Sequence, residues 1–214
     1  MTKRSTSARN AVLLGAECAM LYGLLPLLFC YGWLRLAKWP ALLVLLAVAL
    51  WLASRQCSWR VLLRPGALRA HLPQVLLRAA LAALVIAALT LLFLPQNFLH
   101  FPRVRPRVWA LVMLLYPLLS AYPQELIYRT CFFQRYAPLF ASPRAMLVAS
   151  SLAFAWLHIV FCNVPALVLS LAGGMMLSHT YQRSHSTLAV TVEHALYGCL
   201  LFTIGLGRYF YLPR

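Results

Sequence analysis

The chain has 214 residues, of which 63% are hydrophobic and only 10% are charged. Because a soluble domain is about 25% charged, this composition excludes an ordinary soluble protein and predicts a chain with most of its apolar surface in a lipid bilayer. The net charge of +16 comes from basic residues between apolar runs. That pattern is typical of loops beside membrane helices and does not predict a nucleic-acid-binding surface.

Seven apolar runs are interpreted as transmembrane helices, since a helical span needs about 20 apolar residues. They cover residues 11–34, 39–53, 75–94, 108–133, 145–162, 165–181 and 187–206. The second run is short, so six spans are an alternative. No run alternates as barrel strands do, and a lipid-exposed backbone must satisfy its own hydrogen bonds. The sequence therefore predicts an all-α polytopic membrane protein with about seven transmembrane helices.

A basic stretch, SRQCSWRVLLRPGALRAHLPQ, separates the second and third predicted spans. Arginines between apolar residues predict a helix in the membrane interface, broken at Pro65-Gly66. More of the basic residues lie in the segments that share a side with the N-terminus. The positive-inside rule therefore favours an N-terminus on the inner side of the membrane.

The cysteines do not predict a metal or disulfide framework. None of them forms a CxxC pair, and most lie within apolar runs, so they are interpreted as small buried residues. They are Cys18, Cys30, Cys57, Cys131, Cys162 and Cys199.

The only acidic residues are three glutamates, Glu17, Glu125 and Glu193, and each lies in an apolar run. A charge at the bilayer centre costs about 2.5–3.5 kcal/mol on insertion scales, so such residues usually face the bundle interior and mark a functional site. Glu17 has no evident partner in the sequence and is expected to hydrogen-bond within the bundle. Glu193 is expected to pair with Arg183 or another loop arginine.

Glu125 and Arg129 are four residues apart, which places them on one face of a helix within ion-pair reach. Mutual neutralisation alone would account for that pair. However, Glu125 and His158 each lie about 16 residues from the centre of the connection near residues 141–142. In an antiparallel hairpin they come to the same depth, and a Glu and a His at one depth outline a general-base pair.

His194 lies in the last predicted span, where it could donate a hydrogen bond to a developing oxyanion. Its neighbour Glu193 points about 100° away on a helix. The two side chains therefore cannot face one site equally.

Three motifs in this order, Gln124-Glu125-x-x-x-Arg129, Phe154-x-x-x-His158 and His194, resemble those of the CPBP family. This family comprises CAAX-prenyl proteases and bacteriocin-processing or immunity proteins. The resemblance covers residues 108–207. It implies a four-helix catalytic core at 108–214, preceded at 1–107 by N-terminal transmembrane helices and the basic interfacial segment. It also implies an intramembrane endopeptidase in which a Glu and the second-motif His activate a water, and the third-motif His and an Asn support the oxyanion.

The chain departs from the family pattern at two positions. Gln124 stands where the first Glu is usual, and Gly198 stands where the Asn is usual, four residues after His194. Gln cannot take a proton at neutral pH. Either Glu125 acts as the base while Gln124 orients the water, or the chain is a catalytically inactive binding or immunity protein of the same fold. Gln124, Tyr197 or a backbone N–H could replace the missing Asn donor.

The sequence thus favours a glutamic-type intramembrane endopeptidase that cleaves a membrane-associated protein or peptide, in a bacterial inner membrane. The predicted catalytic residues are Gln124, Glu125, Arg129, His158 and His194. No cofactor is expected. A zinc site of Glu125, His158 and His194 is the alternative, because three such ligands can hold zinc. A proton-coupled transporter ranks last, because neither inverted repeats nor paired broken helices are evident.

Overall fold

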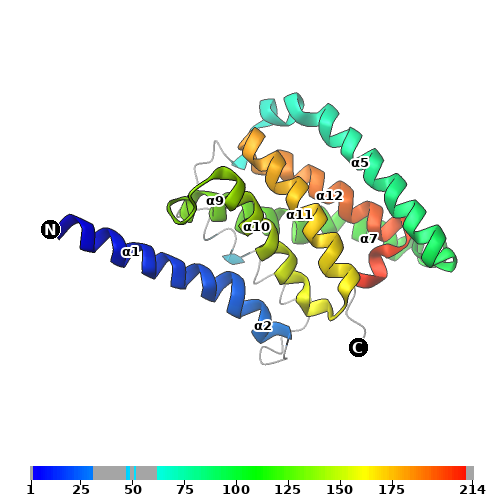
Figure 1. Cartoon of the computed structure of the whole chain (residues 1–214). Helices are drawn as coiled ribbons and strands as arrows, with labels where there is room; N and C mark the ends of the chain where they lie inside the picture. The colour runs from blue at the N-terminus through cyan, green and yellow to red at the C-terminus, as the bar shows by residue number, and fades with distance from the viewer. Residues whose placement is uncertain (1, 31–46, 49–50, 52–61, 211–214) are drawn as a thin grey trace.

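The computed structural model describes residues 2–30, 47–48, 51 and 62–210, and all regular elements in these ranges are helical (Figure 1). The α-helices are α1 (Thr2–Ala19), α2 (Leu25–Cys30), α5 (Pro65–Phe93), α6 (His100–Val104), α7 (Pro106–Tyr116), α8 (Tyr122–Glu125), α9 (Phe132–Arg135), α10 (Pro143–Leu157), α11 (Val164–Ser184) and α12 (Thr187–Ile204). The π and 3₁₀ segments are η1 (Met20–Leu24), η2 (Pro95–Asn97), η3 (Pro117–Ala121), η4 (Leu126–Cys131), η5 (Ala137–Leu139), η6 (His158–Phe161) and η7 (Leu206–Phe210). This confirms the predicted all-α class.

Within the described residues, six helical segments are long and apolar enough to cross a membrane. They are Asn10–Leu28, Pro65–Phe93, Pro106–Arg135, Pro143–Phe161, Val164–Ser184 and Thr187–Ile204. Each coincides with a predicted span, while the predicted span at 39–53 lies largely outside the described residues. The protein is therefore a polytopic integral membrane protein.

The predicted boundary of the third span is wrong. Helix α5 begins at Pro65 rather than near Val75, and it continues through Pro73. Pro65 does not break a helix because it occupies the first helical position, where a missing N–H costs nothing. The part of the basic stretch that includes Arg69 is consequently the first turns of a long membrane helix.

Helix α12 lies at the centre of the bundle and is its most buried span. It packs against α5 on one side and against α11 and the α7–α9 segment on others (Figure 1). By contrast, α5 exposes a row of leucines and valines, including Leu77 and Leu84, which are 62% and 68% exposed. Because such residues are favourable in lipid, this face of α5 is the bilayer-facing side of the bundle.

The fourth span is one helix, Pro106–Arg135, with two wider turns of π-helix inside it, η3 and η4. Pro117 opens η3, and Pro123 follows within α8. Proline removes a backbone donor and clashes with the preceding turn, which disturbs the regular ladder. Such π turns change which face a helix presents, and they are frequent at functional sites.

The N-terminal helices are attached to the end of this fourth span. Tyr22 packs edge-on against Tyr128, Phe132 and Tyr136 and donates a hydrogen bond to the carbonyl oxygen of Ile127 at 2.9 Å. Glu17, for which the sequence suggested no partner, forms an ion pair with Arg135 and accepts a hydrogen bond from the Tyr136 hydroxyl at 2.8 Å.

Candidate active site

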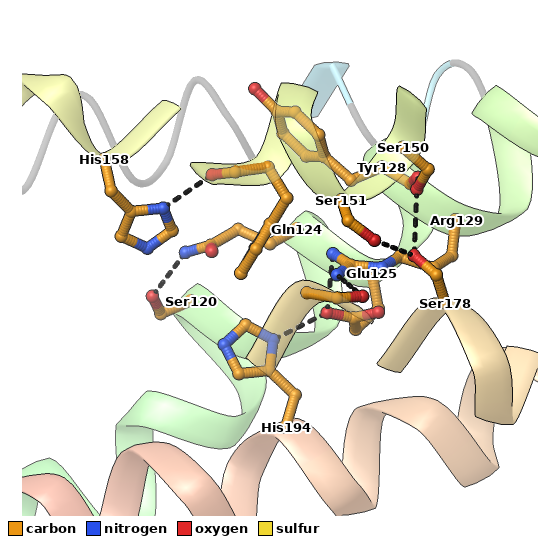
Figure 2. A network of polar contacts seen from close by, with 12 residues as sticks. Ser120, Gln124, Glu125, Tyr128, Arg129, Ser150, Ser151, His158, Ser178 and His194 are labelled. Atoms are coloured by element: carbon orange, nitrogen blue, oxygen red, sulfur yellow. Dashed lines mark hydrogen bonds and ion pairs between the residues drawn. The ribbon is translucent and has the colours of Figure 1, made fainter. Parts of the chain in front are cut away.

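Glu125 is the last residue of α8, and its side chain is completely buried. One carboxylate oxygen, Oε1, accepts a hydrogen bond from Arg129 Nη1 at 3.2 Å and lies 2.7 Å from His194 Nδ1 (Figure 2). The ion pair predicted from the spacing of Glu125 and Arg129 is therefore present. The guanidinium balances the carboxylate charge, and two directional contacts fix the orientation of the carboxylate.

Arg129 is also completely buried, and other helices help to hold it. Its Nη2 donates to the carbonyl oxygen of Gly174 on α11 at 3.3 Å, and its guanidinium carbon lies 4.1 Å from the centre of the Phe154 ring. A cation over an aromatic face is attracted by the ring quadrupole. A side chain at position 174 would meet Ser151 and Phe154 at 3.3 Å, so glycine suits the close packing here.

His194 projects from α12 with both ring nitrogens engaged. Its Nδ1 faces the Glu125 carboxylate, and its Nε2 lies 3.0 Å from the hydroxyl of Tyr116. A carboxylate only accepts, so Nδ1 carries the hydrogen, and in the neutral ring Nε2 accepts from the Tyr116 hydroxyl. The predicted role of His194 as a direct oxyanion donor thus competes with Tyr116 for the same nitrogen.

His158 lies where α10 gives way to η6, and it is 7% exposed. Its Nδ1 lies 2.8 Å from the carbonyl oxygen of Phe154 and must donate to it, which leaves an electron pair on Nε2. Among the described residues the hydrogen bonds of Glu125 go to Arg129 and His194, not to His158. The Phe154 ring packs against both imidazoles, with centroid distances of 4.7 Å to His158 and 5.4 Å to His194.

Gln124 brings two further polar atoms to the site. Its Nε2 donates to Ser120 Oγ at 2.9 Å, and Figure 2 shows its amide on the side of the site that faces His158. Two buried oxygens, Gln124 Oε1 and Glu125 Oε2, have no hydrogen-bond partner within the described part of the chain. Buried acceptors are normally paired. These two atoms are therefore the ones available to a water or a substrate.

Tyr116 is the site residue that sequence reasoning missed. A side chain at Gly198 would place its Cβ 2.2 Å from the Tyr116 ring, so the ring occupies the space that glycine leaves. Tyr197, which the sequence offered as a replacement for the missing Asn, donates instead to Glu193 at 2.6 Å, and that suggestion is wrong. The available signal was Gly198 itself, since a missing side chain four residues after His194 leaves room on the same helix face.

Glu193 belongs to a separate cluster. It pairs with Arg78 of α5 at 3.3 Å, and Arg78 also donates to Thr180 Oγ1 at 2.7 Å. The expectation of an arginine partner is confirmed, but the partner is Arg78 rather than Arg183. Glu193 and His194 face different neighbours, as their angular separation on a helix requires.

The side chains named for the alternative zinc site contact other partners in this structure. Within the described ranges no group of three or more His, Cys, Asp or Glu side chains could hold a metal ion. Glu125 and His194 meet at hydrogen-bond distance, and the other nitrogen of His194 faces Tyr116. A zinc ion would have to displace both contacts.

The fold and the site together define a polytopic membrane protein with a glutamate–histidine site inside its bundle. A family model described as type II CAAX prenyl endopeptidase Rce1-like matches residues 106–200, and this match supports the resemblance to the CPBP family over that region. At the level of the family, this supports a CAAX-type intramembrane protease. No curated protein matches the chain significantly, and neither does any solved structure.

Proposed function

We propose that the protein is a glutamic-type intramembrane endopeptidase in which Glu125 activates the attacking water. The observation that carries this proposal is a buried carboxylate that is held at one oxygen by both an arginine and an imidazole. Oε1 is fixed by Arg129 at 3.2 Å and by His194 at 2.7 Å, whereas Oε2 is buried with no partner among the described residues. A carboxylate held through one oxygen keeps the other for proton transfer, and general bases must lie within hydrogen-bond reach of the proton that they remove.

In this mechanism the water lies against Glu125 Oε2. It attacks the carbonyl carbon of the scissile peptide bond while its proton passes to Glu125, and Glu125 then gives that proton to the leaving amine nitrogen. Gln124 Oε1, which cannot take a proton, accepts the water's second hydrogen bond and orients it. His158 Nε2 keeps a free electron pair, and the proposal assigns it to activation of the water beside Glu125.

The role of Arg129 is to hold Glu125 rather than to contact the substrate. Its guanidinium is completely buried; Nη1 and Nη2 donate to Glu125 and Gly174, and the group lies over the Phe154 ring. A planar fork fixes a carboxylate better than a lysine ammonium does. The proposal therefore assigns catalysis to Glu125 and His158, and positioning to Arg129, His194 and Gln124.

We further propose that this mechanism needs no metal. The reason is chemical: both nitrogens of His194 are engaged by Glu125 and Tyr116. Incubation with EDTA should leave cleavage unchanged. If EDTA abolished cleavage and added zinc restored it, the site would be a metal centre and this proposal would be wrong.

The proposed substrate is a membrane-associated protein or peptide, because Glu125 lies within a membrane-spanning helix and only a chain at or in the bilayer can reach it. The proposed location is a bacterial inner membrane. Prenylated substrates, which the name of the family suggests, are not required by this mechanism.

The second candidate is a catalytically inactive membrane protein that uses the same site to bind a partner. The observation that favours it is Gln124, which removes one of the two carboxylates usual in the family. Both candidates predict an assembled bundle, and only the protease predicts peptide-bond cleavage.

The test uses purified protein in nanodiscs, incubated with membranes of the source organism. New protein N-termini are then identified by mass spectrometry. Wild type should generate termini that are absent with Glu125→Gln, while the matched variant Glu193→Gln should generate the same termini as wild type. Identical termini from wild type and Glu125→Gln would refute the protease and leave the binding protein.

A further inference from the structure

Two cysteines that are far apart in the sequence, Cys30 and Cys162, face each other near the segment that carries His158. Cys30 ends α2, and Cys162 directly follows η6, the segment that begins with His158. Their sulfur atoms lie 3.9 Å apart, and Cys30 Sγ also donates to the carbonyl oxygen of Ile159 at 3.7 Å. Cys162 is exposed rather than buried, so the sequence-based interpretation of a buried cysteine is wrong for this residue.

The position of this pair favours oxidation. The first and fifth spans end at Leu28 and Phe161, so both thiols lie just outside the membrane-spanning segments and at the same end of the bundle. With the N-terminus on the inner side, as the basic residues favour, this is the outer side of the membrane. Disulfides form and persist in compartments on that side.

We propose that Cys30 and Cys162 form a reversible disulfide that ties α2 to the segment carrying His158. A bonded pair has its sulfurs about 2.05 Å apart. Cys162 follows a short 3₁₀ turn and has a left-handed backbone with φ of 53°, so side-chain rotation and a small loop movement can close the gap. The two helical segments α2 and η6 already pack against each other.

The oxidant is a disulfide of the thiol–disulfide exchange class. The Cys162 thiolate attacks one sulfur of that disulfide and releases the other as a thiolate. The Cys30 thiolate then attacks Cys162 Sγ and releases the second donor sulfur. The protein loses two electrons and two protons, and the donor gains both. Burial and the neighbouring Cys162 sulfur raise the pKa of the Cys30 thiol, so the exposed Cys162 reacts first.

The test blocks free thiols by alkylation in intact membranes and then identifies linked peptides by mass spectrometry. A Cys30–Cys162 cross-linked peptide is expected in wild type, should disappear after reduction with dithiothreitol, and should return on adding oxidised glutathione. Cys162→Ser should abolish it, and the matched control Cys199→Ser, on α12, should retain it. If both thiols are alkylated in membranes and remain free after oxidised glutathione, the proposal is wrong.

A second, independent observation concerns Tyr116, and the inference drawn from it rests on the proposed function. The Tyr116 hydroxyl lies 3.0 Å from His194 Nε2, and its ring packs edge-on against both His194 and Phe202. The helix that carries Tyr116 is tied to α12 by the indole N–H of Trp109, which donates to Thr203 Oγ1 at 3.0 Å.

The π turn η3 explains how Tyr116 and Glu125 both reach one imidazole. Nine residues of regular α-helix would place their side chains about 180° apart, since each residue advances by about 100°. A π turn is wider and advances less per residue. Because η3 lies between them, the angle between the two side chains is smaller than 180°, and they contact His194 at its two nitrogens.

We infer that Tyr116 is a positioning residue for the proposed reaction. The Tyr116 hydroxyl donates to Nε2 when His194 is neutral and accepts from Nε2 when His194 is protonated. In both cases it fixes the imidazole ring, whose Nδ1 contacts Glu125. Gly198 is required because a Cβ there would lie 2.2–2.3 Å from atoms of the Tyr116 ring and hydroxyl. The position of the Tyr116 ring therefore depends on glycine at position 198.

The variant Tyr116→Phe keeps the ring and removes only the hydroxyl. Loss of an orienting second-shell partner typically costs about 10- to 100-fold. We expect kcat to fall in that range with KM unchanged and with a shifted acid limb of the pH profile. The matched control Tyr197→Phe, which loses its bond to Glu193, should cleave as wild type does. Gly198→Ala should lower activity strongly alone but add little in a Tyr116→Ala background.

A readout that does not need cleavage separates this inference from the proposed function. Histidine nitrogen NMR of the protein in nanodiscs reports which His194 nitrogen carries hydrogen. Tyr116→Phe should change the His194 signal, and Tyr197→Phe should not. If Tyr116→Phe changes neither the His194 signal nor kcat, Tyr116 only packs against its neighbours and the inference is wrong. If the signal changes but the wild-type protein cleaves no substrate, the positioning role stands and only the proposed protease activity is contradicted.

Discussion

Two buried networks meet on α12, and they are built from similar parts. The Glu125 network consists of Glu125, Arg129, His194 and Tyr116. The Glu193 network consists of Glu193, Arg78, Tyr197 and Thr180. Each has a completely buried glutamate, an arginine partner and a tyrosine.

The two networks differ in what they can do with a proton. In the Glu193 network the arginine side chain is 26% exposed, and the contacts neutralise and anchor the carboxylate. In the Glu125 network the arginine side chain is completely buried, and the His194 imidazole contacts the same carboxylate oxygen as the arginine does. Histidine is the side chain that exchanges a proton near neutral pH. Both glutamates are buried and ion-paired, so the attached imidazole is the feature that favours Glu125 as the proposed base.

The largest expected effect separates the two glutamates. Glu125→Gln should lower cleavage by about 10²–10⁴-fold, because a positioned general base contributes that much. Glu193→Gln should keep activity within a few-fold of wild type, since it removes a charge but leaves the amide able to bond Arg78 and Tyr197. The measurement is kcat/KM in nanodiscs, with helical content checked by circular dichroism. Equal loss in both variants would show that the networks act as one.

The next effect concerns the arginines. Arg129→Ala leaves the completely buried Glu125 carboxylate without its arginine partner, and breaking a buried pair costs about 3–5 kcal/mol. We expect a large drop in thermal unfolding temperature together with loss of cleavage. Arg129→Lys should keep some activity with a less precisely oriented carboxylate.

Arg78→Ala is the control for Arg129→Ala. Because Arg78 is only partly buried and Glu193 keeps the hydrogen bond from Tyr197, the drop in unfolding temperature should be smaller. If the two alanine variants unfold at the same temperature, burial does not distinguish the networks.

A smaller effect is expected from Gln124→Glu, which restores the carboxylate pair usual in the family. Cleavage should be retained or increased, since the new carboxylate places a proton acceptor where the unpaired Gln124 oxygen lies in wild type. The check is kcat across a pH series. Complete inactivation would mean that the Gln124 amide donation to Ser120 is needed.

The smallest effect is expected outside both networks. Glu17 and Arg135 form an ion pair with side chains that are 34% and 39% exposed. The Tyr136 hydroxyl, which donates to Glu17, can still donate to an amide oxygen at this position. Glu17→Gln should therefore shift the unfolding temperature only slightly and leave cleavage unchanged. A loss of cleavage would mean that the N-terminal helices help to form the site.

The features that could be predicted from the sequence are those determined by residues close together in the chain. Long apolar runs specify spans, and a four-residue spacing predicts the contact between Glu125 and Arg129. The connection between two spans brought His158 to the site, though Phe154 separates it from His194. Tyr116 could not be predicted because its orientation depends on a π turn, which shifts the helix face without any change in residue spacing. Pro117 marks the place, but proline alone does not determine the size of the turn.

Phe154 has a consequence for how this site can change. Its ring touches His158, His194 and Arg129, and its carbonyl oxygen fixes the tautomer of His158. The polar residues around it each contact one or two others, so a substitution at one of them perturbs part of the site. Phe154 sets several spacings at once with a single rigid ring. A smaller side chain there would alter those spacings together, so position 154 limits which combinations of polar residues the bundle can accommodate.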